Sequence, residues 1–148
     1  MISSKKTIWI TIITASLILA ITMGVRQSLG LFIEPINNST SLDIVSISFA
    51  LAMGQLVWGL VQPVFGAIAD KKGSFGVLVI GAFMMFFGLL LTPFSQSDFT
   101  LMLTFGILCS AGAGAGSFSI LIGATAKNLP SEKRSFAGGF INAGGSFG

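Results

Sequence analysis

The sequence predicts an all-α integral membrane protein, built as a polytopic bundle of transmembrane helices. Hydrophobic residues make up 53% of the 148 residues and charged residues only 9%, and the mean hydropathy is +0.91. A soluble domain carries roughly 25% charged residues, so this chain has too few polar groups to cover a surface in water. The apolar residues also form runs of about 20 residues, the length that crosses a bilayer. The charges gather in short breaks between these runs.

Composition excludes several classes of site. The chain has no His and a single Cys, Cys109, which excludes a disulfide within the chain, the common zinc sites and a nucleophile activated by His. We expect no enzyme activity, no cofactor and no metal, and Cys109 reads as a small buried hydrophobe. The basic residues form no stripe interleaved with aromatics, so nucleic acid is not an expected partner. The acids are scattered, at Glu34, Asp43, Asp70, Asp98 and Glu132.

Five helices follow from the apolar runs, at about residues 8–33, 44–69, 75–94, 99–126 and 135–148. The last one has about 14 residues before the sequence ends, which is too short to span a bilayer. We therefore expect residues 1–148 to form one partial N-terminal transmembrane domain, truncated within its fifth helix. The basic start of the first helix is also typical of a signal peptide, but the run is too long and further spans follow it.

The breaks between the helices alternate in charge. The breaks at Pro35–Ser41 and Ser95–Asp98 contain no Lys or Arg. The breaks at Asp70–Gly73 and Lys127–Arg134 carry two and three basic residues, and the N-terminus is basic as well. Because basic loops stay on the cytoplasmic side, the N-terminus and the two basic loops are predicted to be cytoplasmic. The expected location is the inner (cytoplasmic) membrane of a bacterium.

The turn after the second helix has an unusual charge arrangement. Lys71 and Lys72 suit a helix C-terminus, the negative end of the helix dipole, whereas Asp70 opposes it. Asp70 therefore needs a further partner, such as a cation or a helix N-terminus. Gly73 permits the positive φ of a short reversal, and Gly66, one turn before Asp70, would let another helix come close. The alternative is an ordinary charged turn at a membrane exit.

Polar and small residues line one side of three predicted helices. Their spacing of three and four residues places each set on one helical face. Within a membrane, polar side chains turn towards partners or a wet cavity. The faces therefore predict a shared interior path, with hydrogen bonding between helices without transport as the alternative. The sets are Thr11, Thr14, Thr22, Arg26 and Gly30; Gln55, Gly59, Gln62, Gly66 and Asp70; and Ser135, Gly138, Asn142 and Gly145.

The fourth predicted helix contains the run Ala111-Gly-Ala-Gly-Ala-Gly116. Gly-x-Gly patterns also occur in nucleotide-binding loops, but those follow a strand in a soluble α/β unit, and no strand is predicted here. Gly112 and Gly116 are four residues apart, a spacing that lets membrane helices approach closely. We therefore assign both to helix packing. The bulky run Phe83–Phe87 on the third helix is expected to face lipid.

The turn Gly66-x-x-x-Asp70-basic-x-Gly73 resembles the loop between helices 2 and 3 of the major facilitator superfamily. The basic N-terminus, the long first helix and the Gly-rich fourth helix are similar to that family as well, so the resemblance covers essentially the whole chain. It implies the first five of about twelve helices, a missing C-terminal half, and transport by alternating access between two halves. It also implies a gating role for Gly66, Asp70, Lys71 and Gly73.

The stretch Gly24-Val-Arg-Gln-Ser-Leu-Gly-Leu-Phe32 resembles the first helix of the monocarboxylate porters and the related oxalate/formate antiporters. This resemblance implies a small organic anion, a monocarboxylate, as the substrate, and a coupling ion such as H⁺. The match to the basic residue of these porters is Gln27, one step after Arg26. The family's loop signature continues with basic residues where this chain has Ser74 and Phe75. Drug/proton antiporters carry an Arg in helix 4 and a Gly-Pro pair in helix 5; both are missing here, so that subgroup is the weaker alternative.

Arg26 lies inside the first apolar run, where a charge is costly. It follows Lys6 by 20 residues, about 30 Å along a helix, which places it in the outer half of the bilayer. Its guanidinium could bind a substrate carboxylate with two parallel hydrogen bonds, snorkel to the outer interface, or pair with an acid of the missing half. The candidate substrate-binding residues are Arg26, Gln27, Gln55, Gln62 and Asn142.

The sequence thus predicts part of a secondary active transporter of a small organic anion. Because alternating access needs two halves, the 148 residues alone are not expected to transport. The alternative is a truncated membrane fragment without transport activity, or a structural partner subunit. In each case the lipid bilayer is an expected partner.

Overall fold

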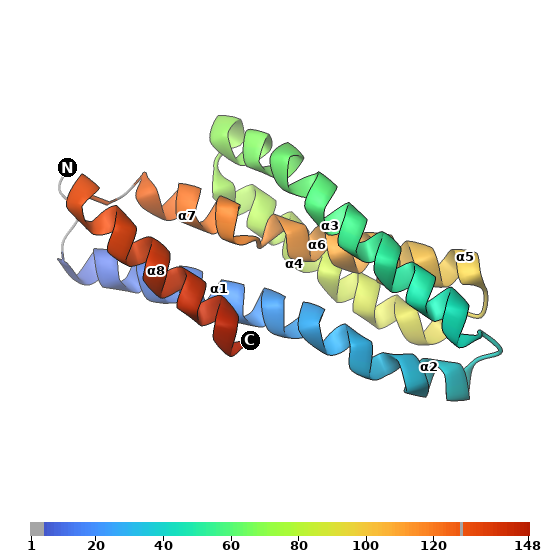
Figure 1. Cartoon of the computed structure of the whole chain (residues 1–148). Coiled ribbons are helices and arrows are strands. Elements are labelled where there is room, and N and C mark those ends of the chain that lie inside the picture. The colour runs from blue at the N-terminus through green and yellow to red at the C-terminus, as the bar shows by residue number, and fades with distance from the viewer. Residues whose placement is uncertain (1–4, 128) are drawn as a thin grey trace.

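The computed structural model describes residues 5–127 and 129–148, and within them the chain is helical without a strand. Figure 1 shows long helices that lie side by side and are joined at the two ends of the bundle. Four helical stretches are long and apolar enough to cross a membrane: Lys5–Ser39, Ile44–Lys72, Ser74–Phe94 and Asp98–Ala126. A bilayer offers no water to a free backbone group, so spanning segments of this kind are helical. The predicted all-α class is confirmed.

The first stretch runs further than predicted. α1 (Lys5–Ser28) continues through the 3₁₀ helix η1 (Leu29–Phe32) into α2 (Ile33–Ser39). The predicted loop that starts at Pro35 is therefore wrong, and the connection is confined to residues 40–43. Pro35 lies in the first turn of α2, directly after the 3₁₀ helix, and its ring nitrogen has no hydrogen to donate.

The second stretch is α3 (Ile44–Lys72), and it begins at a capped end. The Asp43 carboxylate accepts a hydrogen bond of 2.8 Å from the backbone N–H of Ser46. This bond satisfies one of the free donors of the first turn, and it lowers the pKa of Asp43 below its ordinary value. Pro63 lies inside the helix, where it removes one backbone hydrogen bond.

A single residue reverses the chain after α3. Gly73 joins it to α4 (Ser74–Leu91), which is followed by the 3₁₀ helix η2 (Thr92–Phe94). Gly73 has a φ of 91°, the conformation that its predicted place in the reversal requires. Asp70 belongs to the last turn of α3, so the turn is tighter than the predicted four-residue break.

The fourth stretch is interrupted. Its segments are α5 (Asp98–Leu101), the π-helix η3 (Met102–Cys109), α6 (Ser110–Ala115) and α7 (Phe118–Ala126). Helical geometry is left between α6 and α7, at residues 116–117. The predicted range of 99–126 matches this stretch, but its π-helix and short break were not predicted, because they leave no mark on hydropathy.

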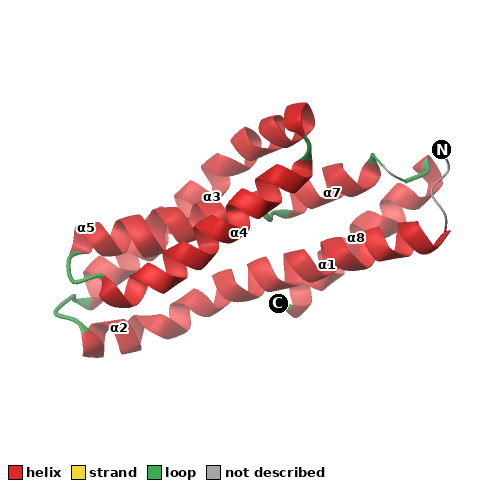
Figure 2. Cartoon of the chain, turned by 180° about the vertical axis from the view of Figure 1, so that it is seen from behind, coloured by secondary structure: helices red, strands yellow, loops and turns green. Residues whose placement is uncertain are grey.

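The last helix, α8 (Ser131–Phe147), starts four residues before the predicted position. It lies against α1, whereas α6 and η3 pack against both α3 and α4, and α7 contacts both groups. Figure 2 shows the same two groups from behind. The fourth stretch occupies the middle of the bundle: 72% of its most apolar window is buried, against 17% for Ile44–Lys72. Its central position explains why it is rich in small residues, which let neighbouring backbones approach.

The predicted burial of Cys109 is confirmed, whereas the run Phe83–Phe87 is divided: its phenylalanines are exposed, but Met85 packs against the core. Cys109 is a free cysteine, 1% exposed, in the core cluster that also contains Phe105 and Ile47. Phe83, at 59% exposed, belongs to a set of bulky side chains on the outer surface of α4. That surface is the one that lipid would cover in a membrane.

The connections between the helices sort by charge. The start of α1, the α3–α4 reversal and the α7–α8 connection lie at one end of the bundle in Figure 1, and the α2–α3 and α4–α5 connections lie at the other. In the described chain every basic residue except Arg26 belongs to the first end. This is the arrangement that the alternating charges of the breaks require of an up-and-down bundle.

Candidate functional site

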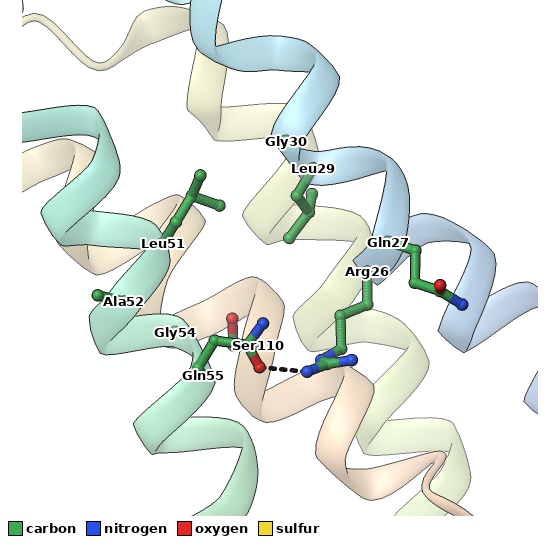
Figure 3. Close-up of a pocket in the computed structure, with 9 residues that line it drawn as sticks. All are labelled: Arg26, Gln27, Leu29, Gly30, Leu51, Ala52, Gly54, Gln55 and Ser110. Atoms are coloured by element: carbon green, nitrogen blue, oxygen red, sulfur yellow. Dashed lines mark hydrogen bonds between the residues drawn. The ribbon is translucent and has the colours of Figure 1, made fainter. Parts of the chain in front are cut away.

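A cavity of about 310 Å³ lies between α1 and α3, with one wall from α6. In Figure 3 the side chains of Arg26 and Gln55 point towards one another from the two helices, and Ser110 lies on α6 beside them. Gln27 also lines the cavity, but its side chain points away from Gln55. Three of the five predicted substrate-binding residues therefore surround one space.

Two side chains of α3 hold the guanidinium of Arg26. An Nη2 hydrogen donates to Oε1 of Gln55, and Cζ lies 4.1 Å from the centre of the Trp58 ring. Among the described residues no carboxylate forms an ion pair with Arg26. The ion pair that occurs in the described chain joins Lys127 to Asp70, away from this site. A guanidinium has five N–H donors, so Arg26 retains donors and an uncompensated charge.

A second cavity, of about 510 Å³, adjoins the same part of α1. It is lined by Gln27, Gln62 of α3 and Asn142 of α8, together with Trp58 and Phe118. Gln27 lines both cavities. The structure therefore brings the five predicted residues around two spaces that share one residue, rather than around a single space.

Sequence reasoning missed Trp58. The residue follows Gln55 by three positions, which places both on one side of α3, and it contacts Arg26 from there. The available signal was a tryptophan one turn away from a polar residue within an apolar run. Apolar side chains of membrane helices, however, more often pack against other helices or contact lipid. Ser110 was also missed, because the sequence cannot show which face of the interrupted fourth stretch meets α3.

The predicted polar face of the first helix does not form one path. Thr11 and Thr14 line a different cavity, of about 310 Å³, between α1, α4 and α7. Thr22 is buried, and its hydroxyl donates to the backbone oxygen of Gly116 over 3.2 Å. In the described chain, the polar residues of α1 that were predicted to share an interior path therefore line separate spaces. Other helices contact α1 on more than one side. The spacing of polar residues along the sequence shows which of them share a face, but it does not show which helix each one meets.

The predicted gating turn has a specific partner. Asp70 Oδ1 lies 3.1 Å from Nζ of Lys127, just beyond the end of α7, so the cation that Asp70 needs comes from the α7–α8 connection. Lys71 occupies the last turn of α3 and Gly73 the reversal. Gly66 behaves differently: a Cβ built there would meet nothing within 4 Å. The described residues therefore do not fill the space that Gly66 leaves, and the close approach of another helix there stays a prediction.

Gly112 and Gly116 both lie at close contacts, but against different helices. A Cβ on Gly112 would lie 2.5 Å from the backbone nitrogen of Met85 on α4. A Cβ on Gly116 would lie 2.5 Å from Cγ2 of Thr22 on α1. The spacing of four therefore serves two contacts, because the helix is interrupted at Gly116.

The arrangement fits the recognition of a small anion. Arginine binds a carboxylate with two parallel hydrogen bonds, and the amides of Gln27, Gln62 and Asn142 can donate further hydrogen bonds from the neighbouring cavity. In the described part of the chain, no group of three or more metal-ligating side chains occurs.

Comparison with known proteins agrees with the fold. The sequence profile of the Major Facilitator Superfamily matches residues 2–148. The chain is 26% identical over 140 residues to the oxalate:formate antiporter of Oxalobacter formigenes, and 27% identical over 146 residues to the MFS-type transporter opdF of Penicillium oxalicum. Each match covers 95% of this chain and 33% of the relative, so the chain spans about a third of the relatives' length. The protein is an integral membrane protein that belongs to the Major Facilitator Superfamily.

Proposed function

We propose that this chain is the N-terminal part of a secondary active transporter that moves a small organic anion, a monocarboxylate in the first instance, by alternating access. The residues proposed to bind the anion are Arg26, Gln27, Gln55, Gln62 and Asn142. An oxalate:formate antiporter among the relatives supports an anionic carboxylate substrate. Proton coupling is part of the proposal.

The observation that carries the proposal is the state of Arg26. Its guanidinium lines a cavity of about 310 Å³, and among the described residues it has a neutral hydrogen-bond acceptor and an aromatic face but no carboxylate. A charge at membrane depth is retained where it has a partner or a function. A substrate carboxylate supplies the missing counter-charge.

The extended first helix argues against snorkelling. Helical structure continues from Arg26 for thirteen residues, to Ser39, which is about 20 Å along the axis. A side chain that snorkels runs along its own helix towards the nearer interface. Arg26 instead reaches across to Gln55 and Trp58 of α3.

A second half is the proposed partner of this bundle. On α3, a Cβ on Gly59 or on Gly66 would meet nothing within 4 Å, so there is room beside these two glycines of the polar face for a further helix. The relatives are about three times as long as this chain, which is compatible with a further half that covers the face. Alternating access then consists of rocking one half against the other around the anion. The proposed location is a bacterial inner membrane, with a cytoplasmic N-terminus.

Uptake of labelled formate and oxalate into proteoliposomes that contain the full-length protein tests the proposal. Arg26→Ala should abolish uptake, and Arg26→Lys should leave a weak remnant, because Lys keeps the charge but loses the paired donors. Lys133→Ala removes a basic residue at the far end of the bundle and serves as the control, with wild-type uptake expected. Protein insertion is measured first for each variant.

Other results would reject the anion site. Wild-type uptake by Arg26→Ala would exclude any essential role for the residue, and equal uptake by Arg26→Lys would favour snorkelling. Recovery of uptake in Arg26→Ala when an acid of the second half is also neutralised would show a structural ion pair instead.

A further inference from the structure

Trp58 has no role in the predictions made from the sequence, yet it contacts the central cation of the site. We propose that Trp58 is a positioning residue: its indole face fixes the plane of the Arg26 guanidinium, so that the free edge of the guanidinium meets the substrate. This inference rests on the proposed function, because it assumes that Arg26 binds the anion.

The geometry of the contact supports this role. The guanidinium carbon is 4.1 Å from the centre of the indole ring, well inside the distance of about 6 Å at which a cation and an aromatic face attract. Gln55 accepts a hydrogen bond from one edge of the same group. One turn of α3 therefore holds Arg26 by its face and by one edge. When the planar guanidinium is held in this way, its remaining N–H donors point in fixed directions. Two-point binding of a carboxylate requires such fixed donors.

The position of Trp58 is set by packing. Its indole N–H is buried and has no acceptor among the described residues, so no hydrogen bond of its own holds the ring. The helix behind it comes close: a Cβ on Gly114 of α6 would overlap with Cγ2 of Val61, and it would lie 3.3 Å from the backbone oxygen of Trp58 and 3.8 Å from Cδ1 of its ring. Gly114 thus leaves the space in which this turn of α3, with Trp58 and Val61, lies against α6.

Trp58 also belongs to the wall of the second cavity. It lines the cavity of about 510 Å³ that contains Gln62 and Asn142, whereas the Arg26 that it contacts lines the other one. Trp58 therefore touches the guanidinium and also borders the space that the amides of Gln62 and Asn142 line.

Fluorescence tests the contact without any need for transport. In the full-length protein, Trp58 is kept as the only tryptophan and the others are replaced by Phe. Arg26→Gln should change the emission intensity or maximum of Trp58, because the stacked cation is removed, and Arg26→Lys should change it less. A protein that keeps only Trp9, which packs edge-on against Phe136 on α8, is the matched control and should not respond. Emission from Trp58 that is indifferent to Arg26→Gln would overturn the proposal.

Transport kinetics test the positioning role. Trp58→Leu removes the aromatic face and should raise KM about three- to tenfold with Vmax retained, as expected for the loss of a cation–π contact. Trp58→Phe keeps an aromatic face and should restore most of the affinity. A fall in Vmax with unchanged KM in both variants would overturn the positioning role, since it would indicate a part in the conformational cycle.

A third variant separates the position of the ring from its chemistry. Gly114→Ala leaves Trp58 intact but pushes this turn of α3 away from α6, because the new Cβ would overlap with Cγ2 of Val61. Trp58 moves with the turn, so KM should rise as in Trp58→Leu; an unchanged KM would count against the packing argument. The proposed function and this inference fail separately. Suppose that Arg26→Ala shows normal uptake and that Trp58 emission still responds to Arg26→Gln. The contact between Trp58 and Arg26 would then be real, but neither the anion site nor the positioning role would stand.

Discussion

The Asp70 carboxylate at the end of α3 and the Lys127 ammonium just beyond α7 form an ion pair, with 3.1 Å between Oδ1 and Nζ. The Lys127 and Asp70 side chains are 56% and 76% exposed. Exposed pairs of this kind contribute about 0–1 kcal/mol to stability. The pair offsets the unfavourable placement of Asp70 at a helix C-terminus, and it joins the second and fourth helical stretches at the basic end of the bundle.

Neutralising this pair should affect turnover and leave stability nearly unchanged. In the full-length transporter we expect Asp70→Asn to lower Vmax by about fivefold or more, the lower range of typical coupling between sites, with KM unchanged, because Asp70 is remote from Arg26. The melting temperature should stay close to that of the wild type. Lys127→Gln is the matched partner variant. Normal turnover in Asp70→Asn would contradict a gating role for the turn.

The proposed orientation places Asn38 outside and both Lys72 and Lys133 in the cytoplasm. All three side chains are exposed in the structure, so a cysteine at each position should react with a membrane-impermeant thiol reagent. In a Cys109→Ser background, position 38 should label from the outside of intact cells, and positions 72 and 133 only after the membrane is opened. Labelling of position 38 only from the cytoplasmic side would reverse the topology.

Gln55 offers a sharp test of how the site is kept open. Gln55→Glu places a carboxylate against the Arg26 guanidinium and should form an internal ion pair, because the two opposite charges attract at hydrogen-bond distance. The substrate then competes with a permanent partner, so KM should rise by about tenfold or more, the effect of 1.4 kcal/mol or more. Gln55→Leu creates no such competitor and should raise KM less. Equal kinetics for the two variants in proteoliposomes would show that Gln55 does not determine how accessible Arg26 is.

Gly112 should be the more sensitive of two glycines in the fourth stretch. Gly112→Ala brings a Cβ to 2.6 Å from the backbone oxygen of Gly81, and overpacking of this kind costs about 1–3 kcal/mol. Gly123→Ala is the control, because a Cβ there meets nothing within 4 Å. Thermal unfolding of the purified proteins in detergent should show a lower melting temperature for Gly112→Ala alone. A similar decrease in both variants would mean that helix propensity or lipid contact, not the α4 contact, sets the effect.

The helical class could be read from composition because a membrane limits the choices of the backbone. Without water, every backbone group needs an internal partner, so long apolar runs become helices. The reversal at Gly73 could also be predicted from the sequence, because a positive φ favours glycine. The sequence also predicted that Asp70 needs a partner against the helix dipole, although it could not name Lys127.

What the tertiary structure alone decided is the direction in which each polar residue faces and what it meets. Helical spacing put Thr11 and Arg26 on one face of the first helix, but the structure has them lining different cavities. The contact of Arg26 with Trp58 depends on how α1 packs beside α3. In lipid such packing is driven by close fit between small residues and by hydrogen bonds between helices. Both depend on neighbours far apart in the chain, so hydropathy and spacing define the helices, and the association of those helices creates the site.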